Sequence, residues 1–409
     1  MVQILPYVYL GYMFISIYFV TFYLLLFIRN RKNMFESPEV TKKYTISVLV
    51  PAYNEQDTIE NTIKAVFDSK YPIDELIVLD DGSKDDTGKI VKSLLKKYSK
   101  LVYINKENSG KADSLNQGIK LAKSELIAVV DADSYPEKEA FGRLVGFFDD
   151  EKVGVATPYI IPRNREKFWE KLQYIEYSVI AFTRKLLGYV DAIYVTPGPL
   201  ALYRKSALEH IGGFDKENMT EDIEVTWHLT KEGYKRKMSL GAVATTTVPS
   251  KLKPWLTQRR RWNLGGLQCI SKYKRYFLRK GMLGFFILPF FILNLFLGLV
   301  GLSIFLYLSI SRIITNYFYV RSSFIVGSAV ISSGNFHYTP SFLNYLGIIL
   351  FVFGLIYTIL ILFIMKQNIM VKKHNFFIFL IYSTVYLMFY PFILVTSLYH
   401  YFKGVQRWR

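Results

Sequence analysis

Four short motifs of charged residues occur in a fixed order along this chain of 409 residues. They are Asp80-Asp81-Gly82-Ser83, Asp131-Ala132-Asp133, Thr220-Glu221-Asp222 and Gln258-Arg259-Arg260-Arg261-Trp262. Carboxylates can bind a hard divalent cation or take a proton from a hydroxyl, and arginine binds phosphate oxygens. Together the motifs suit the transfer of a sugar from a nucleotide donor, with a different motif for each step.

The second motif predicts a metal site. Asp131 and Asp133 follow an apolar segment, Leu126 to Val130, which we expect to be a buried strand. Mg²⁺ is usually held by one or two carboxylates together with phosphate oxygens of the substrate. We therefore predict that Asp133 and Asp131 bind Mg²⁺ or Mn²⁺, and that the metal neutralises a departing nucleoside diphosphate. The alternative is a chance pair of acids.

Three other segments could contact the nucleotide-sugar. A carboxylate at Asp81 can accept from a base N–H or a ribose hydroxyl, whereas a plain turn would explain Gly82 but no second acid. Lys111, at a helix start, suits a phosphate, although a solvated lysine is the alternative. The loop after the first strand could cup base and ribose, or be a simple strand-to-helix turn. Its residues are Pro51, Ala52, Tyr53, Asn54 and Glu55.

The third motif has two interpretations that can both hold. Thr220 could be an N-cap, followed by acids that suit the first turn of a helix from Glu221 to Lys231. Alternatively, Asp222 is the general base that deprotonates an acceptor hydroxyl.

The fourth motif is also open to two interpretations. It fits an interfacial helix with a tryptophan at the membrane surface. It also fits a site in which Arg261 binds a pyrophosphate and Trp262 packs on a sugar ring. Gln258 favours the second interpretation, because a membrane surface does not require it.

Alternating strands and helices would position the first two motifs. We expect strands at Ile46 to Val50, Leu76 to Leu79, Leu101 to Ile104 and Leu126 to Val130. Helices are expected at Gln56 to Ser69, Asp85 to Tyr98 and Lys111 to Lys123. Repeated units of this size predict an α/β fold with a doubly wound, mainly parallel sheet. Ligands bind beyond the carboxyl ends of such strands, where Asp81 and Asp131 lie.

The two ends of the chain are apolar and predict membrane helices. All 33 acidic residues lie between Glu36 and Glu232, and the first 28 residues carry no charge. Tyr7 to Phe27 is long enough to span a bilayer, and the basic residues that follow place its C-terminal side in the cytoplasm. Three more apolar runs follow the central region, at Met282 to Ile310, Leu343 to Met365 and Phe376 to Leu398.

These features predict four regions. They are an N-terminal transmembrane helix (1–32), a cytosolic catalytic domain (44–250), basic interfacial helices (251–281) and C-terminal transmembrane helices (282–409). The domain is thus inserted between membrane helices, in a multi-pass protein of the cell membrane. One span before the domain and three after it would leave the basic tail from Lys403 to Arg409 outside. Either one run does not cross, or a segment such as Phe324 to Ile331 enters the membrane.

Charge and cysteine content exclude other classes. The net charge is +18, and its densest block, Lys251 to Lys280, has ten basic residues directly before an apolar run. That position favours a bilayer with anionic headgroups over nucleic acid as the partner. Cys269 is the only cysteine, which excludes an intrachain disulfide and a zinc–cysteine cluster. No oligomeric state is predicted.

The four motifs in this order resemble the processive branch of family 2 glycosyltransferases, which includes cellulose, chitin, hyaluronan and poly-N-acetylglucosamine synthases. The resemblance covers roughly Ile46 to Trp262, and its most specific part is Gln-x-x-Arg-Trp. It implies a GT-A fold and inversion of the anomeric centre. Two details depart from the family pattern: Ser114 stands where alanine is usual, and the segment Thr196 to Ala201 has an extra proline.

The resemblance also implies roles for individual residues. Asp222 would be the base, Asp81 would contact the nucleotide, and Asp131 and Asp133 the metal and diphosphate. Pro51, Ala52, Tyr53, Glu55, Lys111 and Arg261 would complete the nucleotide-sugar site, and Glu221, Gln258 and Trp262 the acceptor site.

The leading hypothesis is a synthase that extends a polysaccharide from a UDP-sugar, with UDP-N-acetylglucosamine as the expected donor. A polyprenyl-phosphate glycosyltransferase would share the nucleotide half but use a lipid acceptor, and such enzymes generally lack Gln-x-x-Arg-Trp. A non-catalytic scaffold subunit of a membrane complex is the alternative from another class, and it predicts loss of a catalytic carboxylate. A transporter is weaker, because the expected spans contain no acidic residue.

Overall fold

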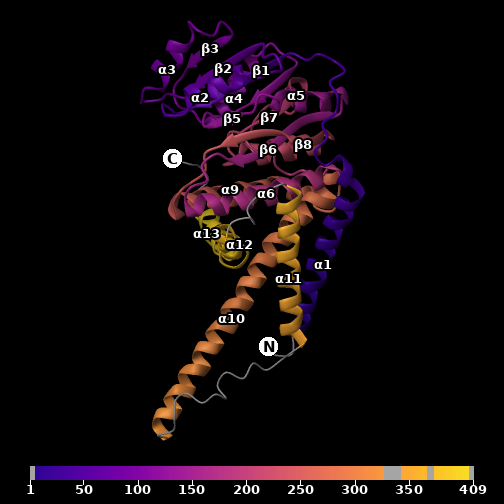
Figure 1. The fold of residues 1–409 in the computed structure, drawn as a ribbon, viewed down its shortest axis with the longest axis vertical. Helices are drawn as coiled ribbons and strands as arrows, with labels where there is room; N and C mark the ends of the chain where they lie inside the picture. The colour runs from indigo at the N-terminus through magenta and orange to yellow at the C-terminus, as the bar shows by residue number, and fades with distance from the viewer. Residues whose placement is uncertain (1–4, 327–341, 366–372, 405–409) are drawn as a thin grey trace.

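The structure is a computed structural model that describes residues 5–326, 342–365 and 373–404. Figure 1 shows an α/β domain at one end of the molecule and long helices that extend from it toward the other end. Between these two parts lies a layer that contains helices α6 (Phe168–Gly188) and α9 (Leu252–Tyr273).

The α/β domain is built on an eight-stranded sheet in the order β3-β2-β1-β4-β7-β6-β8-β5. Its strands are β1 (Ile46–Ala52), β2 (Glu75–Asp80), β3 (Leu101–Asn105), β4 (Leu126–Val129), β5 (Ser134–Pro136), β6 (Val153–Pro162), β7 (Ala201–Arg204) and β8 (Lys235–Thr246). The pairs β1–β2, β1–β4, β2–β3 and β6–β8 are parallel. The pairs β4–β7, β5–β8 and β6–β7 are antiparallel.

Helices cover both faces of this sheet. They are α2 (Ile59–Phe67), α3 (Thr87–Leu94), α4 (Lys111–Leu121), α5 (Ala140–Val145), α7 (Lys205–His210) and α8 (Glu221–Lys231). Apolar residues of α2, α3 and α5 join one core cluster, and those of α4, α7 and α8 join another. In β1, Val48 and Val50 face the first cluster and Leu49 the second, as the alternation of a strand requires. The doubly wound arrangement is therefore confirmed.

The expected elements are present with shifted ends. All four predicted strands and all four predicted helices of this region form, and α8 has the predicted bounds. Helix α3 ends at Leu94 rather than at Tyr98. Helix α2 begins at Ile59 rather than at Gln56, because the intervening backbone is held by the next loop. Gln56 there hydrogen-bonds to Asp85 and Asp86 instead of starting the helix.

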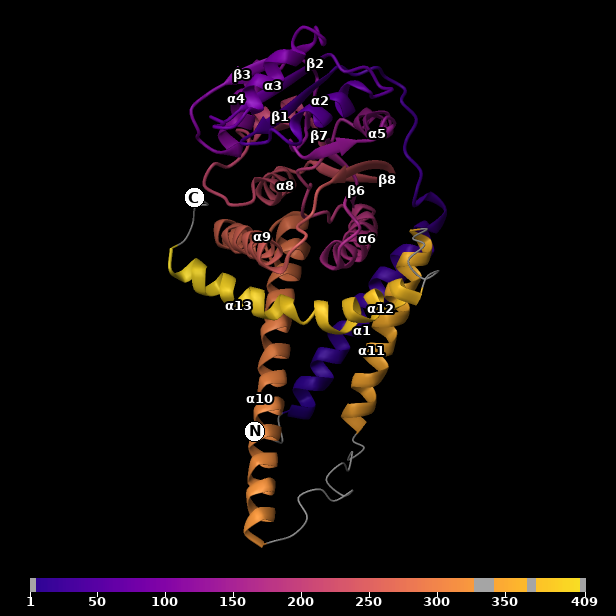
Figure 2. The ribbon, with the colours of Figure 1, turned by 60° about the vertical axis from the view of Figure 1, so that its left-hand side comes forward.

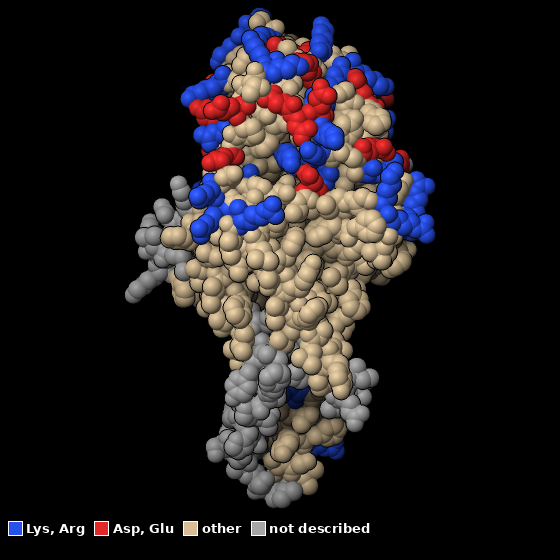
Figure 3. Space-filling model, turned by 90° about the vertical axis from the view of Figure 1, so that its right-hand side faces the viewer, with Lys and Arg blue, Asp and Glu red and all other residues tan. Residues whose placement is uncertain are grey.

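Two helices are long and apolar enough to cross a membrane, within Pro6–Asn33 and Leu283–Ile325. The first contains α1 (Leu5–Asn30), and the second contains a π-helical turn (Leu283–Ile287) and α10 (Leu288–Val326). A third helix, α11 (Phe342–Ile364), packs beside α1 and against α6. Figure 3 shows the consequence for the surface, since Lys, Arg, Asp and Glu crowd the α/β end and the region beneath it is nearly free of charge.

Two apolar runs differ from the sequence expectation. Helix α10 continues 16 residues beyond Ile310, where the predicted run ends. The run Phe376 to Leu398 is not one straight helix: it comprises α12 (Lys373–Ile381), a π-helix (Tyr382–Tyr386) and α13 (Phe389–Phe402), with a bend of 41°. In Figure 2 this pair lies crosswise to α10. The segments 327–331 and 405–409, on which the sequence expectations also drew, lie outside the described residues.

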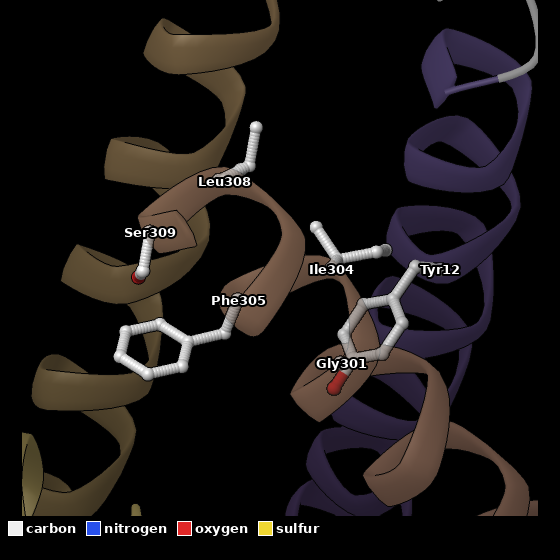
Figure 4. A pocket seen from close by; sticks show the side chains of 6 residues that line it. All are labelled: Tyr12, Gly301, Ile304, Phe305, Leu308 and Ser309. Atoms are coloured by element: carbon white, nitrogen blue, oxygen red, sulfur yellow. The ribbon is translucent and has the colours of Figure 1, made fainter. Parts of the chain in front are cut away.

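A cavity of about 240 Å³ lies between α1 and α10. Figure 4 shows its lining, which is Tyr12, Gly301, Ile304, Phe305, Leu308 and Ser309. These residues belong to the apolar helices, so the cavity is separate from the charged motifs.

Candidate active site

Lys111 joins two of the predicted motifs. Its Nζ lies 2.6 Å from Asp131 Oδ1 and 2.6 Å from Glu221 Oε1. Lys111 is the first residue of α4, Asp131 follows β4, and Glu221 is the first residue of α8. Burial alone would lower the pKa of Lys111, but attraction by the two carboxylates outweighs it and raises the pKa above its ordinary value. Lys111 therefore remains an ammonium group at the centre of the site.

Asp222 stands beside this pair on α8. Burial, reinforced by the neighbouring charge of Glu221, raises the pKa of Asp222 to about 7. The positive charges of Lys111 and Arg261 act in the opposite direction but do not cancel the rise. A carboxylate with a pKa near neutrality can take a proton from a hydroxyl and later release it, as a general base must.

The start of α8 is not capped by the Thr220 side chain. No side-chain cap hydrogen bond forms there, and Thr220 Oγ1 instead donates to Asn218 Oδ1 at 3.2 Å. Asp222 Oδ1 accepts from the N–H of Ile223 at 2.9 Å. The helix begins where expected, but the capping interpretation does not account for the Thr220 hydroxyl.

Asp133, Asp131 and Glu55 are close enough to repel one another. Burial comes first among the causes that raise the pKa of Asp133 to about 6, and the charges of Asp131 and Glu55 follow. The pKa of Glu55 is also raised, first by burial and further by the charge of Asp131. The hydroxyl of Thr58, which donates to Glu55 Oε2 at 2.5 Å, acts in the opposite direction but does not cancel the rise. Excess negative charge of this kind is a suitable environment for a cation.

The metal expectation can be tested against these side chains. Within residues 5–326, 342–365 and 373–404, no three His, Cys, Asp or Glu side chains are grouped to hold a metal ion by themselves. Asp133 with Asp131 therefore fits a Mg²⁺ or Mn²⁺ ion only if substrate oxygens supply further ligands, the arrangement typical of Mg²⁺ with phosphates.

Asp81 is held by the loop that follows β3. Its Oδ1 accepts from Lys106 Nζ and from Ser109 N, and its Oδ2 accepts from Gly110 N at 2.8 Å. Burial would raise the pKa of Asp81, but these donors outweigh it and the pKa lies below its usual range. Asp81 thus fixes the backbone just before Lys111, and its contact with a nucleotide remains a prediction.

The loop after β1 contacts the loop after β2. Asn54 has a φ of +55°, its N–H donates to Ser83 Oγ at 3.0 Å, and its Oδ1 accepts from Lys84 N at 2.8 Å. Pro51 and Ala52 are buried in β1, whereas Tyr53 is 45% exposed. Of the predicted base-binding residues, Tyr53 therefore offers a side-chain surface, and Pro51 and Ala52 could contribute only through their backbone.

The fourth motif divides between two environments. The positive charge of Arg261 acts to lower the pKa of both Glu221 and Asp222, so the guanidinium lies near enough to interact with these carboxylates. Gln258 Oε1 accepts from Arg259 Nη1 at 2.5 Å, and the Trp262 ring lies 4.0 Å from the Arg259 guanidinium carbon. Among the described residues, neither Gln258 nor Trp262 hydrogen-bonds to the carboxylates.

Sequence reasoning missed two residues of the site. A Cβ on Gly198 would lie 2.5 Å from Asp131 Oδ2 and 2.9 Å from Lys111 Nζ, so a side chain there would require Asp131 and Lys111 to shift. Arg184, buried on α6, is near enough to Asp222 for the charges to interact. The signals were a glycine between Pro197 and Pro199, and an arginine on a largely apolar helix face.

Part of the chain is similar to known glycosyltransferases. Residues 47–212 match the model of a family described as "Glycosyl transferase family 2". A poly-beta-1,6-N-acetyl-D-glucosamine synthase from Staphylococcus aureus (strain MSSA476) is 34% identical over 266 residues, which are 63% of this chain and 64% of that protein. The protein of the same name from Staphylococcus epidermidis is 32% identical over 265 residues, with the same two shares. The matched region thus spans slightly less than two thirds of these relatives.

The fold is shared with a solved structure, the mannosyltransferase PcManGT from Pyrobaculum calidifontis in complex with GDP-Man and Mn2+. The TM-score is 0.61, the identity is 18%, and the match covers 96% of this chain and 99% of the other. The expected GT-A architecture, with a largely parallel curled sheet, is confirmed.

Proposed function

We propose that this chain, whose residues 47–212 form a family 2 glycosyltransferase domain, is a membrane-bound inverting enzyme that adds sugars from a UDP-sugar to a growing polysaccharide. N-acetylglucosamine is the expected sugar, because the staphylococcal relatives are named for a polymer of it. The observation that carries the proposal is the meeting of Lys111, Asp131, Glu221 and Asp222 from three separate segments of the chain.

Asp222 acts as the general base in this proposal. It takes the proton of an acceptor hydroxyl while that oxygen attacks the anomeric carbon from the face opposite the nucleotide. The bond between the anomeric carbon and the diphosphate oxygen breaks, and the electron pair leaves with UDP. The pKa of Asp222, about 7, allows it to be ionised before attack and to hold the proton afterwards.

Lys111 and Arg261 bind the negative charge of the diphosphate. The fold itself holds both near the carboxylates, so they need little rearrangement to bind the diphosphate. Asp133 and Asp131 would hold a Mg²⁺ or Mn²⁺ ion, which neutralises charge on the leaving group when it is bound. Tyr53, Glu55 and Asp81 would contact the nucleotide, and Glu221, Gln258 and Trp262 the acceptor.

The domain faces the cytoplasm and the apolar helices insert in the bilayer. This assignment is supported by the two helices that are long and apolar enough to span, and by the basic residues Arg29, Arg31 and Lys32 at the domain end of α1. Nucleotide-sugars are cytoplasmic, so the catalytic pocket would have direct access to its donor. A cell-membrane location follows from this arrangement.

The direct test is UDP release by the full chain, purified in detergent, with UDP-N-acetylglucosamine and Mg²⁺ or Mn²⁺. Asp222→Asn should lower the turnover by roughly 10²- to 10⁴-fold, the range expected for loss of a general base. Donor binding, measured by calorimetry, should persist. Asp150→Asn is the matched control, because Asp150 pairs with Lys235 at the far end of the sheet. Near-normal turnover by Asp222→Asn would contradict the base assignment.

Product analysis separates the synthase from its nearest rival. Labelled product that stays in the aqueous or insoluble fraction supports a polysaccharide synthase. Labelled product that extracts into organic solvent and moves as a lipid on thin-layer plates supports a polyprenyl-phosphate glycosyltransferase. Absence of any UDP release, with donor still bound, would instead favour a non-catalytic subunit.

A further inference from the structure

A buried ion pair lies beneath the fourth motif. Arg259 on α9 and Glu176 on α6 are 1% and 4% exposed, and two hydrogen bonds join the guanidinium to the carboxylate. An ion pair removed from water is stable only if its remaining hydrogen-bonding positions are also filled. The residues that fill them come from a distant part of the chain.

Two tyrosines of the C-terminal helix pair complete this network. Tyr386 OH donates to Glu176 Oε2 at 2.7 Å, and Tyr390 OH donates to Glu176 Oε1. Tyr386 is the last residue of the π-helix, and Tyr390 is the second residue of α13, so they flank the 41° bend. π-Helical turns occur often at functional sites. The bend therefore places two hydroxyls on one carboxylate.

Arg259 in turn contacts two predicted acceptor residues. Its guanidinium donates to Gln258 Oε1 and lies 4.0 Å from the centre of the Trp262 ring. It also lies 5.6 Å from the centre of the Trp255 ring, and Trp255 packs against Tyr386 with ring centres 4.9 Å apart. A planar guanidinium in contact with an aromatic ring restricts the orientation of that ring. The orientation of Trp262 thus depends on a group that the tyrosines hold in place.

We propose that Glu176, Tyr386 and Tyr390 are positioning residues that act through Arg259 on Trp262, so that the bent C-terminal helix pair sets the geometry of the acceptor site. The inference rests on the proposed function, since it assigns Trp262 to the acceptor. Donor binding involves Lys111, Asp131 and Arg261, and within the described part of the chain the hydrogen bonds of the network do not reach these residues. Loosening the network should therefore affect the acceptor and leave the donor unaffected.

The test uses Tyr386→Phe, Tyr390→Phe and the double variant, each of which removes only hydroxyl groups. UDP release is measured while UDP-N-acetylglucosamine and a β-1,6-linked N-acetylglucosamine oligosaccharide are varied separately. We expect the acceptor KM of the double variant to rise by about tenfold or more, because a small misplacement of a binding group is costly. The donor KM should stay within about twofold, and the polymer should be shorter.

Two matched controls come from neighbouring residues. Tyr382→Phe alters a tyrosine of the same π-helix for which the described residues provide no hydrogen bond. Arg260→Met removes the arginine next to Arg259, which has no ion-pair partner in the described part of the chain. Both should keep the normal acceptor KM. An unchanged acceptor KM in the double tyrosine variant, or an equal rise in both KM values, would overturn the proposal.

A second measurement does not depend on activity. The fluorescence of Trp262 is obtained as the difference between each chain and its Trp262→Phe counterpart, and its quenching by acrylamide is followed. Stronger quenching in the double tyrosine variant is expected, because the ring is less restrained. If the native chain releases no UDP, the proposed function fails while this quenching still decides the positioning role. Identical quenching in the native and variant chains would refute it.

Discussion

At the level of single side chains, the charges of the candidate site are only partly paired. Lys111 pairs with Asp131 and Glu221, whereas burial and then neighbouring carboxylates raise the pKa values of Asp133 and Asp222, which form no ion pair within the described residues. A buried carboxylate with no cation is costly, and its pKa rises until part of the cost is relieved by protonation. Asp133 is one of the two predicted metal ligands, and Asp222 is the residue predicted for proton transfer.

The pH dependence of turnover should report Asp222. Only the ionised base can accept a proton, so kcat/KM should fall as the pH drops through about 7, the pKa of Asp222. Glu221→Gln removes a charge that raises this pKa, so the acid limb should move to lower pH. The measurement is a pH–rate profile from about pH 5 to about pH 9 for both chains. An acid limb that does not move would exclude Asp222 as the titrating group.

Ionisation of Asp222, which favours turnover, should lower the stability of the folded chain. The folded-state pKa of Asp222 exceeds the ordinary value of 3.8, so the folded chain holds a proton that the unfolded chain has released. Stability therefore falls as the pH rises from about 4 to about 7. Asp222→Asn removes this loss, and its Tm should exceed that of the native chain above about pH 7 but not near pH 4.

Asp150→Asn provides the contrast for this stability experiment. Lys235 comes first among the groups that hold the pKa of Asp150 below its usual value, so its ionised form stabilises the fold above that value. This variant should lose stability at neutral pH. A Tm change of the same sign in both variants would show that the effect is not one of ionisation.

A side chain at Gly198 should displace Asp131. A Cβ there would lie 2.5 Å from Asp131 Oδ2 and 3.0 Å from its Oδ1, so Asp131 or the loop must shift. We expect Gly198→Ala to raise the donor KM by about tenfold, the usual order for a displaced binding group. Gly142→Ala is the control, because its Cβ would meet only Tyr71 at 3.9 Å. Equal donor KM values in the two variants would contradict the assigned position of Gly198.

At the site, sequence reasoning could place a residue where its motif stands at the end of an element. Asp131 and Lys111 were expected near one edge of the sheet, whereas the role of Asp222 came from the family resemblance. The structure brings the three residues together, and their roles stay predictions. Neither the pairing of Lys111 with Glu221 nor the need for Gly198 could be predicted. Both depend on the spacing between segments that lie far apart along the chain, which no local pattern encodes.

Among the elements, the contact of α8 with α9 is especially close. A Cβ on Gly265 of α9 would lie 1.7 Å from Thr220 Oγ1 at the start of α8. The glycine thus lets the helix with Arg261 approach the helix with Asp222. Helix packing at this distance is possible only where one partner lacks a side chain.

Gly265→Ala should therefore separate the two helices. We expect lower turnover and a lower Tm, because overpacking of this kind typically costs about 1–3 kcal/mol. Gly266→Ala is the control one residue later, since its Cβ would meet Phe291 at an ordinary 3.6 Å. Adding Thr220→Ala to Gly265→Ala should restore part of the turnover. Full activity of Gly265→Ala alone would mean that this approach is not needed.

Helices and strands were predictable where apolar residues keep one regular spacing along the segment. They were not predictable where that spacing changes. The central strands and helices follow from alternation and from helical spacing of apolar residues, whose buried positions match. The antiparallel pairing of β5 with β8 joins Ser134 to Thr246, which no local signal links. The bend between α12 and α13 was missed because length and hydropathy do not register a change from α- to π-helical turns.

At the scale of the whole molecule, the bend bears on the number of membrane crossings. If α1, α10 and α11 cross and the bent pair lies along the surface, as its crosswise position in Figure 2 favours, the chain crosses three times. Both the α/β domain and the end of α13 then lie in the cytoplasm. This arrangement agrees with the basic character of the tail, which four crossings would not.

Thiol labelling should establish this topology. Cys269 is buried, and burial raises the pKa of its thiol, so the native chain offers little background. Ser322→Cys on the exposed end of α10 should react with a membrane-impermeant maleimide in intact cells. Lys403→Cys, at the exposed end of α13, should react only after permeabilisation. Labelling of Lys403→Cys in intact cells would instead require a fourth crossing.

The double pairing of Lys111 has a consequence for the end of each catalytic cycle. When an anionic product leaves a pocket, the positive side chains that bound it lose their counter-ion. The cost of leaving them unpaired ordinarily slows release of the product. Here two carboxylates lie 2.6 Å from the Lys111 ammonium group, so its positive charge has counter-ions as soon as the product leaves. In the proposed reaction, the ion pairs of Lys111 with Asp131 and Glu221 must loosen when the donor binds. Their return then favours release of UDP.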